Sequence, residues 1–99
     1  GLQMNSAPEK KLVIFGSAEI AELAYFYFQN DTDYKVVAFT VDDDFISADS
    51  FCGLPLIPFS KLARLYPNDS HEMFVALSYN KLNKLRESKY RQAKDADIN

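Results

Sequence analysis

The fold of this chain is decided by one stretch near its N-terminus, Leu12-Val13-Ile14-Phe15-Gly16-Ser17-Ala18-Glu19-Ile20-Ala21-Glu22-Leu23. Its first four residues are apolar and predict a buried β-strand, and residues from about 18 to 29 form a helical pattern that Ser17 is placed to cap. Small residues in the turn between them allow a ligand's phosphate to approach the amides at the start of the helix. A strand, a small-residue turn and a helix in this order are typical of a nucleotide-binding site.

The turn carries only part of the dinucleotide-binding pattern G-x-G-x-x-G. Gly16 stands at the first glycine, whereas Ala18 and Ala21 stand at the second and third. Two interpretations are open: Gly16 and Ala18 lie beneath the phosphates of a ligand, or they let the helix and the strand pack closely. Glu19, in the first helical turn, would satisfy the helix dipole itself and repel a phosphate.

Length and charge narrow the possible classes of protein. The 99 residues, of which 47% are hydrophobic, predict one globular domain with its own core. The net charge of −3 disfavours a nucleic-acid partner, which requires a basic surface. No run approaches the roughly 20 apolar residues that span a bilayer, and the first ten residues lack a secretory pattern. We therefore expect a cytoplasmic protein without a membrane partner.

Neither a metal site nor a catalytic set is expected. Cys52 has no second cysteine with which to pair, and we expect it to be a buried structural thiol. His71 is expected in an exposed polar loop far from the ligand site. The acidic run 42–44 lacks the alternating ligands and the turn glycine of a calcium loop. No Ser/His/Asp or Cys/His combination with a catalytic context can be assembled.

Strand and helix patterns alternate along the rest of the chain. Strands are predicted at 34–41, 53–58 and 73–77, and helices at 61–65 and 81–94. Pro55 and Pro58 confine the short strand 53–58 to an edge of the sheet. We expect a small Rossmann-like three-layer α/β domain with a mostly parallel four-stranded sheet of order 3-2-1-4 and helices on both faces. We expect residues 1–10 to be a flexible N-terminal segment and its first residues to be a remnant of expression.

The expected ligand site lies at the carboxyl ends of the central strands, which is the usual site in open α/β sheets. Asp42 directly follows the second strand, where it could accept hydrogen bonds from a ribose or a base, and Asp43 is a second candidate. Ser78, Tyr79 and Asn80 follow the fourth strand and would close the other side. Either Tyr79 stacks on a base, or these three residues form an ordinary helix-capping turn.

The first helix carries aromatic side chains around most of its circumference, from Tyr25 to Phe28. One face of this helix covers the sheet, and the sequence does not identify what covers the others. The helix is therefore a candidate for self-association or for docking of another domain. The alternative is that its tyrosines simply leave their hydroxyls in water.

Residues 12 to about 95 resemble the N-terminal domain of bacterial sugar O-acyl/N-acetyltransferases of the PglD/NeuD type. Three segments carry the resemblance: Val13-Ile14-Phe15-Gly16-Ser17-Ala18-Glu19-Ile20-Ala21, then Ala38-Phe39-Thr40-Val41-Asp42-Asp43 with Gly53-Leu54-Pro55-Leu56, and Phe74-Val75-Ala76-Leu77-Ser78-Tyr79-Asn80. The resemblance implies a nucleotide-sugar-binding domain over residues 11–99 that takes part in polysaccharide biosynthesis.

The resemblance also implies the contents of the site. Gly16, Ser17 and Ala18 would lie under the phosphates of a UDP- or dTDP-sugar. In that family a left-handed β-helix follows this domain, binds acetyl-CoA and carries the catalytic histidine. Because this chain contains no such repeats, we expect no catalytic residue and no cofactor within it. The alternatives are an NAD- or CoA-binding regulatory module, and a docking or oligomerisation domain without a ligand.

Overall fold

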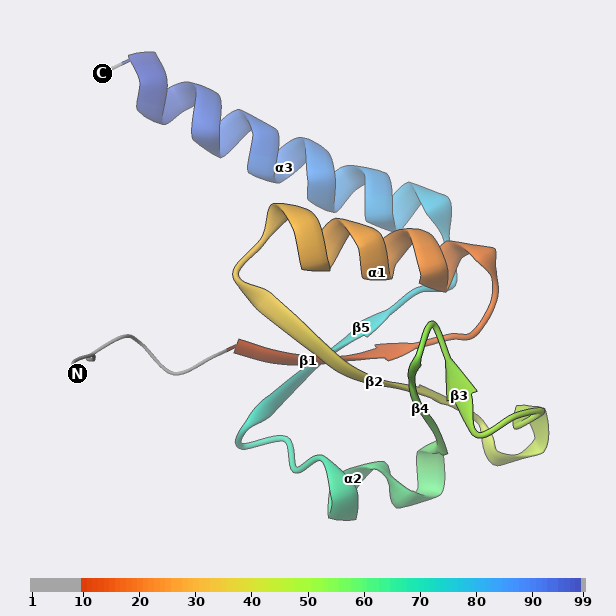
Figure 1. The fold of residues 1–99 in the computed structure, drawn as a ribbon. Coiled ribbons are helices and arrows are strands. Elements are labelled where there is room, and N and C mark those ends of the chain that lie inside the picture. Colours follow the sequence, from red (N-terminus) through yellow and green to blue (C-terminus); the bar gives the residue numbers. More distant parts are fainter. Residues whose placement is uncertain (1–9, 99) are drawn as a thin grey trace.

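The computed structural model describes the backbone of residues 10–98 and the side chains of residues 10–88. The strands are β1 (Lys10–Phe15), β2 (Tyr34–Val41), β3 (Ser50–Phe51), β4 (Leu54–Pro58) and β5 (His71–Val75). The helices are α1 (Glu19–Asp31), α2 (Leu62–Leu65) and α3 (Tyr79–Ile98), with 3₁₀ turns η1 (Asp43–Phe45) and η2 (Phe59–Lys61). Helices α1 and α3 lie on one face of the sheet and α2 lies on the other (Figure 1). Of the predicted N-terminal segment 1–10, all but Lys10 lies outside the described residues.

The sheet has five strands in the order β3-β4-β2-β1-β5. The β1-β2, β1-β5 and β2-β4 pairs are parallel, and the β3-β4 pair is antiparallel. The α/β class is confirmed, but the prediction of a four-stranded sheet is wrong because β3 has only two residues, too few to show a sequence pattern. β3 pairs with β4 on the side away from β2, so β4 is not the edge strand that its prolines predicted.

The β3-β4 connection is a two-residue turn with an unusual backbone. Cys52 has φ 54° and Gly53 has φ 78°. Positive φ at both central residues is what a type I′ hairpin turn requires. Cys52 is half-buried against the core rather than fully buried as expected, and its burial raises the pKa of its thiol.

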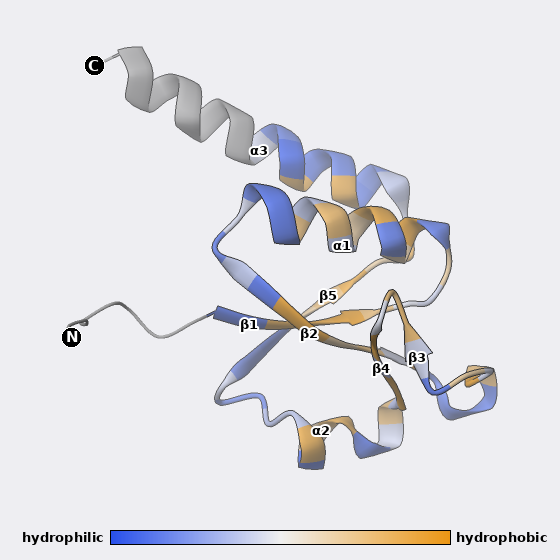
Figure 2. Ribbon diagram, in the orientation of Figure 1, coloured by the Kyte–Doolittle hydropathy of each residue, from blue (hydrophilic) through white to orange (hydrophobic). Residues whose placement is uncertain are grey.

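The core follows the two central strands, which are covered on both faces (Figure 2). Ile14 on β1 and Phe39 on β2 are both fully buried. The Phe39 ring packs against Tyr25 of α1 at 5.9 Å and against Phe51 of β3 at 4.9 Å between ring centroids. Buried Thr40 donates its hydroxyl hydrogen to the carbonyl of Ile57 at 2.8 Å, so this polar group is satisfied.

Helix α3 covers the aromatic side of α1. Leu82 of α3 is only 2% exposed, and the Arg86 guanidinium lies 5.9 Å from the centroid of the Tyr27 ring. Phe28 packs edge-on against Phe74 of β5 at 5.2 Å. Tyr27 and Phe28 are therefore buried, and Phe26 remains half-exposed. Within the part of the chain that the structure describes, no helix has both the length and the apolar composition needed to cross a membrane.

The packing of α3 can be tested by shortening its most buried side chain. Leu82→Ala is expected to lower the free energy of unfolding by about 2–4 kcal/mol, because it leaves a cavity in the core. Urea denaturation measures this change. Leu65→Ala, at an exposed position of α2, is the control and should change the stability by less than about 1 kcal/mol. Equal effects would contradict the packing of α3 described above.

Candidate functional site

A cleft of about 520 Å³ opens at the carboxyl ends of β1, β2 and β5. β1 pairs with β2 on one side and with β5 on the other, so the chain reverses its direction of winding there. Ligands of open α/β sheets bind at such a switch point, and pockets of roughly 300–1,000 Å³ suit small molecules. The lining residues are Phe15, Gly16, Ser17, Ala18, Ile20, Val41, Asp42, Phe45, Ala76 and Leu77.

Gly16 lies at the floor of the cleft, where hydrogen bonds connect the ends of three strands. Its amide donates to the carbonyl of Thr40 at 2.8 Å, and the amide of Ala76 donates to the carbonyl of Phe15 at 2.9 Å. Gly16 has φ 137°, and a Cβ atom there would lie 3.1 Å from the Ala76 carbonyl oxygen and 3.4 Å from the Cβ of Ala21. Close packing therefore requires this glycine, and the packing interpretation of Gly16 has direct support.

The start of α1 adjoins the cleft, since Ser17, Ala18 and Ile20 line it. The N-cap residue is Ala18, which makes no side-chain cap hydrogen bond, so the prediction that Ser17 caps the helix is wrong. The Ala18 carbonyl accepts hydrogen bonds from the amides of Ala21 at 2.9 Å and Glu22 at 3.2 Å. Ser17 is half-buried and lines the cleft.

The two aspartates after β2 have different environments. Asp42 lines the cleft and is exposed. Asp43 accepts two hydrogen bonds from Ser60, one from its amide to Oδ1 at 3.0 Å and one from its hydroxyl to Oδ2 at 2.5 Å. The hydroxyl bond is the main cause that lowers the pKa of the Asp43 carboxyl. Asp43 therefore fastens η1 to η2 and does not line the cleft.

Residues 78–80, where α3 begins, form a helix cap and not a wall of the cleft. The Ser78 hydroxyl accepts a hydrogen bond from the Lys81 amide at 3.4 Å, as expected of a helix-capping turn. The Tyr79 hydroxyl donates to Oε1 of Glu19 at 2.8 Å, which ties the start of α3 to the start of α1 and raises the pKa of Tyr79. Asn80 is exposed on the first turn of α3. Ser78, Tyr79 and Asn80 are not among the lining residues.

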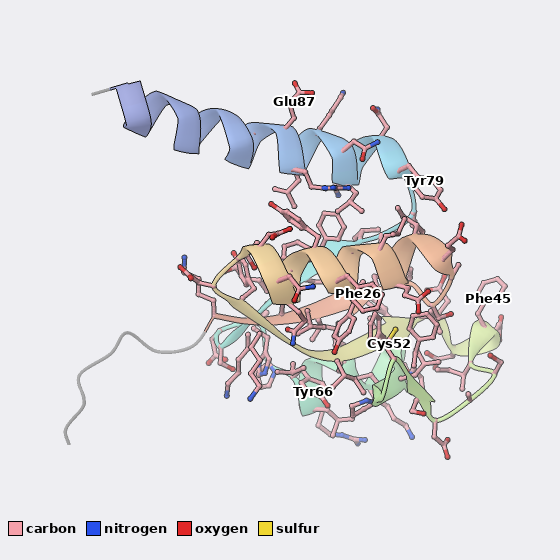
Figure 3. The ribbon with its side chains drawn as sticks, turned by 45° about the horizontal axis from the view of Figure 1, so that its top comes forward. Phe26, Phe45, Cys52, Tyr66, Tyr79 and Glu87 are labelled. Carbon is pink, nitrogen blue, oxygen red and sulfur yellow. The ribbon has the colours of Figure 1, made fainter. Side chains whose placement is uncertain are left out.

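Two apolar lining residues were missed by the sequence analysis. Phe45 is 69% exposed and Leu77 is 70% exposed. Phe45 extends beyond the ribbon at the end of the domain where Tyr79 begins α3 (Figure 3). The available signal for Phe45 was an aromatic residue directly after an acidic run. For Leu77, the signal was an apolar residue directly before the predicted capping residue Ser78.

The cleft contains little charge. Among the described residues that line it, Asp42 is the only ionisable side chain, and none is basic. Glu19 lies next to the lining residue Ala18, in the first turn of α1. The environment of the cleft is therefore apolar with a negative edge.

None of the described residues that line the cleft is a histidine or a cysteine. Within the described part of the chain, no three His, Cys, Asp or Glu side chains come together to hold a metal ion. His71 is the first residue of β5 and is half-buried, not an exposed loop residue as predicted. Its Nδ1 lies 2.9 Å from the Ser70 hydroxyl and 3.0 Å from the Pro67 carbonyl oxygen. Because His71 begins β5 and the cleft lies at the carboxyl end of that strand, His71 lies away from the cleft.

Comparisons with known proteins find no similar family: no family model, no curated protein and no solved structure matches this chain.

Replacing Gly16 tests whether the floor of the cleft needs a glycine. Gly16→Ala is expected to lower the free energy of unfolding by about 2–3 kcal/mol, because it combines an unfavourable φ with a contact against Ala76. Gly53→Ala is the matched control, since its φ is also positive but a Cβ meets nothing within 4 Å. That change should cost about 1 kcal/mol. Equal losses in urea denaturation would show that the close approach carries no cost.

The link between Asp43 and Ser60 predicts a pH-dependent contribution to stability. The pKa of Asp43 lies below its ordinary value of 3.8 in the folded state, so the stabilisation is present above that pH. It is lost as the pH falls through the lower, folded-state pKa. Asp43→Asn should therefore lower Tm at neutral pH, and the difference from the unsubstituted protein should narrow in acid. Thermal unfolding across pH measures this, with Asp44→Asn as the control. A difference that stays constant in acid would contradict the role of the charge.

Proposed function

We propose that this domain binds a nucleotide sugar in the cleft and holds it for acyl transfer carried out elsewhere. The observation that carries the proposal is the pairing of a small-residue turn, Gly16 to Ala18, with the carboxylate of Asp42 at one switch point. In dinucleotide-binding folds, an acid after the second strand accepts hydrogen bonds from ribose hydroxyls. The resemblance to PglD/NeuD-type enzymes leads to the same class of ligand, a UDP- or dTDP-sugar.

Asp42 is available to a ligand, unlike its neighbour. Its carboxylate accepts no hydrogen bond from the described part of the chain, whereas both oxygens of Asp43 are occupied by Ser60. An ionised carboxylate accepts from two hydroxyls at once, and each bond to a charged group is stronger than a neutral one. The ribose diol of a UDP-sugar is therefore a suitable partner for Asp42, whereas the deoxyribose of a dTDP-sugar offers it a single hydroxyl.

The proposed role is to hold the substrate and not to transform it. General acid–base and nucleophilic catalysis require a matched pair of groups, and the described lining offers only one ionisable side chain. Ser17 has a hydroxyl at the cleft but no base beside it among the lining residues. Acetyl-CoA and the catalytic histidine would belong to a separate β-helical domain, and the setting of such sugar modification would be the cytoplasm.

The alternative of a docking domain has weaker support. It depends on the aromatic residues 25–28 of α1 being exposed on the surface. Because α3 and β5 bury Tyr27 and Phe28, the helix does not present a broad aromatic face. The alternative of an NAD or CoA module is weakened by the dinucleotide-binding pattern itself, because Ala18 and Ala21 stand where its second and third glycines would be.

Removing the Asp42 carboxylate tests the proposed site. Asp42→Ala is expected to weaken nucleotide-sugar binding by at least about tenfold, because hydrogen bonds to a charged group are lost. Isothermal titration with UDP-, dTDP-, GDP- and CMP-sugars measures the affinity. Asp44→Ala, an exposed acid outside the cleft lining, should leave binding unchanged, and both variants should keep the original Tm. Unchanged affinity in Asp42→Ala would move the site elsewhere.

A further inference from the structure

The two most exposed large apolar side chains among the described residues lie on the same cleft. They are Phe45 at 69% and Leu77 at 70%. Phe45 comes from η1 after β2, and Leu77 comes from the segment after β5, so they reach the cleft from the two strands that flank β1. Apolar surface exposed in this way gains free energy when a ligand covers it.

Phe45 is held in place although its ring is exposed. Its amide donates to the carbonyl of Asp42 at 2.8 Å. The turn that contains it is fastened to η2 through Asp43 and Ser60. A ring on an anchored turn loses little backbone entropy when it packs against a ligand, so its position favours stacking.

The carboxylates around the cleft would repel a phosphate group. Asp42 is negative, and Glu19 places a second carboxylate at the start of α1, where its hydrogen bond from Tyr79 at 2.8 Å holds it. Two lysines could balance the charge of a phosphate, but each interacts with another group. Lys61 acts on Asp43, and the Lys81 ammonium lies 5.6 Å from the Phe74 ring centroid. Neither lysine lines the cleft.

We infer that the cleft recognises the nucleoside part of its ligand, with the base between Phe45 and Leu77 and the ribose hydroxyls on Asp42. The phosphates and the sugar lie at the negative edge without a cationic partner and project outward. This inference rests on the proposed function, since it assigns the parts of a nucleotide sugar within the same cleft. The domain would then bind the nucleoside end of its substrate and leave the sugar end accessible to a catalytic partner.

Added salt is expected to change the affinity of this cleft in the opposite direction from its effect on a cationic phosphate site. Where cations hold a phosphate, added salt screens the attraction and weakens binding. Here the phosphates meet carboxylates, so salt screens a repulsion. A nucleotide sugar should therefore bind no less tightly at high salt than at low salt, and the uncharged nucleoside should be insensitive to salt.

Isothermal titration of the whole chain tests the inference. Uridine, thymidine, guanosine and cytidine are each compared with their nucleotide sugars at low and high salt. We expect one nucleoside to bind with a Kd within about threefold of its nucleotide sugar. Phe45→Ala should weaken both by about tenfold, the loss expected for one base stacked on an aromatic ring. Phe26→Ala removes a half-exposed ring of α1 outside the lining and should leave both affinities unchanged.

Each other outcome has one meaning. A nucleotide sugar that binds while its nucleoside does not, or whose binding weakens with salt, overturns the inference and leaves the proposed function standing. Binding that Phe45→Ala leaves unchanged removes the base from its assigned place and also overturns the inference. Failure of every nucleoside and every nucleotide sugar to bind overturns the proposed function, and the inference with it.

Discussion

The close approach of Gly16 to the end of β5 is the constraint on which the rest of the site depends. The amide of Gly16 bonds to Thr40 of β2, and the carbonyl of the preceding Phe15 bonds to Ala76 after β5. One turn thus joins three strand ends while it leads the chain into α1. A side chain at Gly16 would press on the Ala76 carbonyl and would have to adopt an unfavourable φ, so this position favours glycine. A packing requirement and the proposed ligand site therefore share the same residue.

The two aspartates that directly follow β2 make different contacts. Asp43 uses both carboxylate oxygens on Ser60 and fixes the turn, whereas Asp42 keeps its carboxylate for the cleft. The fixed turn in turn positions Phe45 at the rim. The same separation holds at the start of α1, where Glu19 is occupied by Tyr79 and Ser17 remains at the cleft. Asp42 and Ser17, which are proposed to bind the ligand, line the cleft, whereas their neighbours Asp43 and Glu19 make the structural contacts.

The sequence predicted the parts of this arrangement that depend on local patterns. Apolar runs indicated the central strands, the small-residue turn indicated Gly16, Ser17 and Ala18, and the end of the second strand indicated Asp42. All four of these residues line the cleft. What it missed depends on contacts between distant residues. The bond between Asp43 and Ser60 spans 17 positions, and that between Tyr79 and Glu19 spans 60. β3 was missed because its two residues extend only through pairing with β4.

The central claim is that a nucleotide occupies the cleft at the carboxyl ends of β1, β2 and β5. The most direct measurement is a titration of the isotope-labelled chain with nucleotide sugars, followed through its backbone amide NMR signals. The account predicts that the signals of Gly16 to Ala18, Asp42, Phe45 and Leu77 shift together. Shifts confined to the segment 59–69 around α2, or no shifts with any nucleotide sugar, would contradict it.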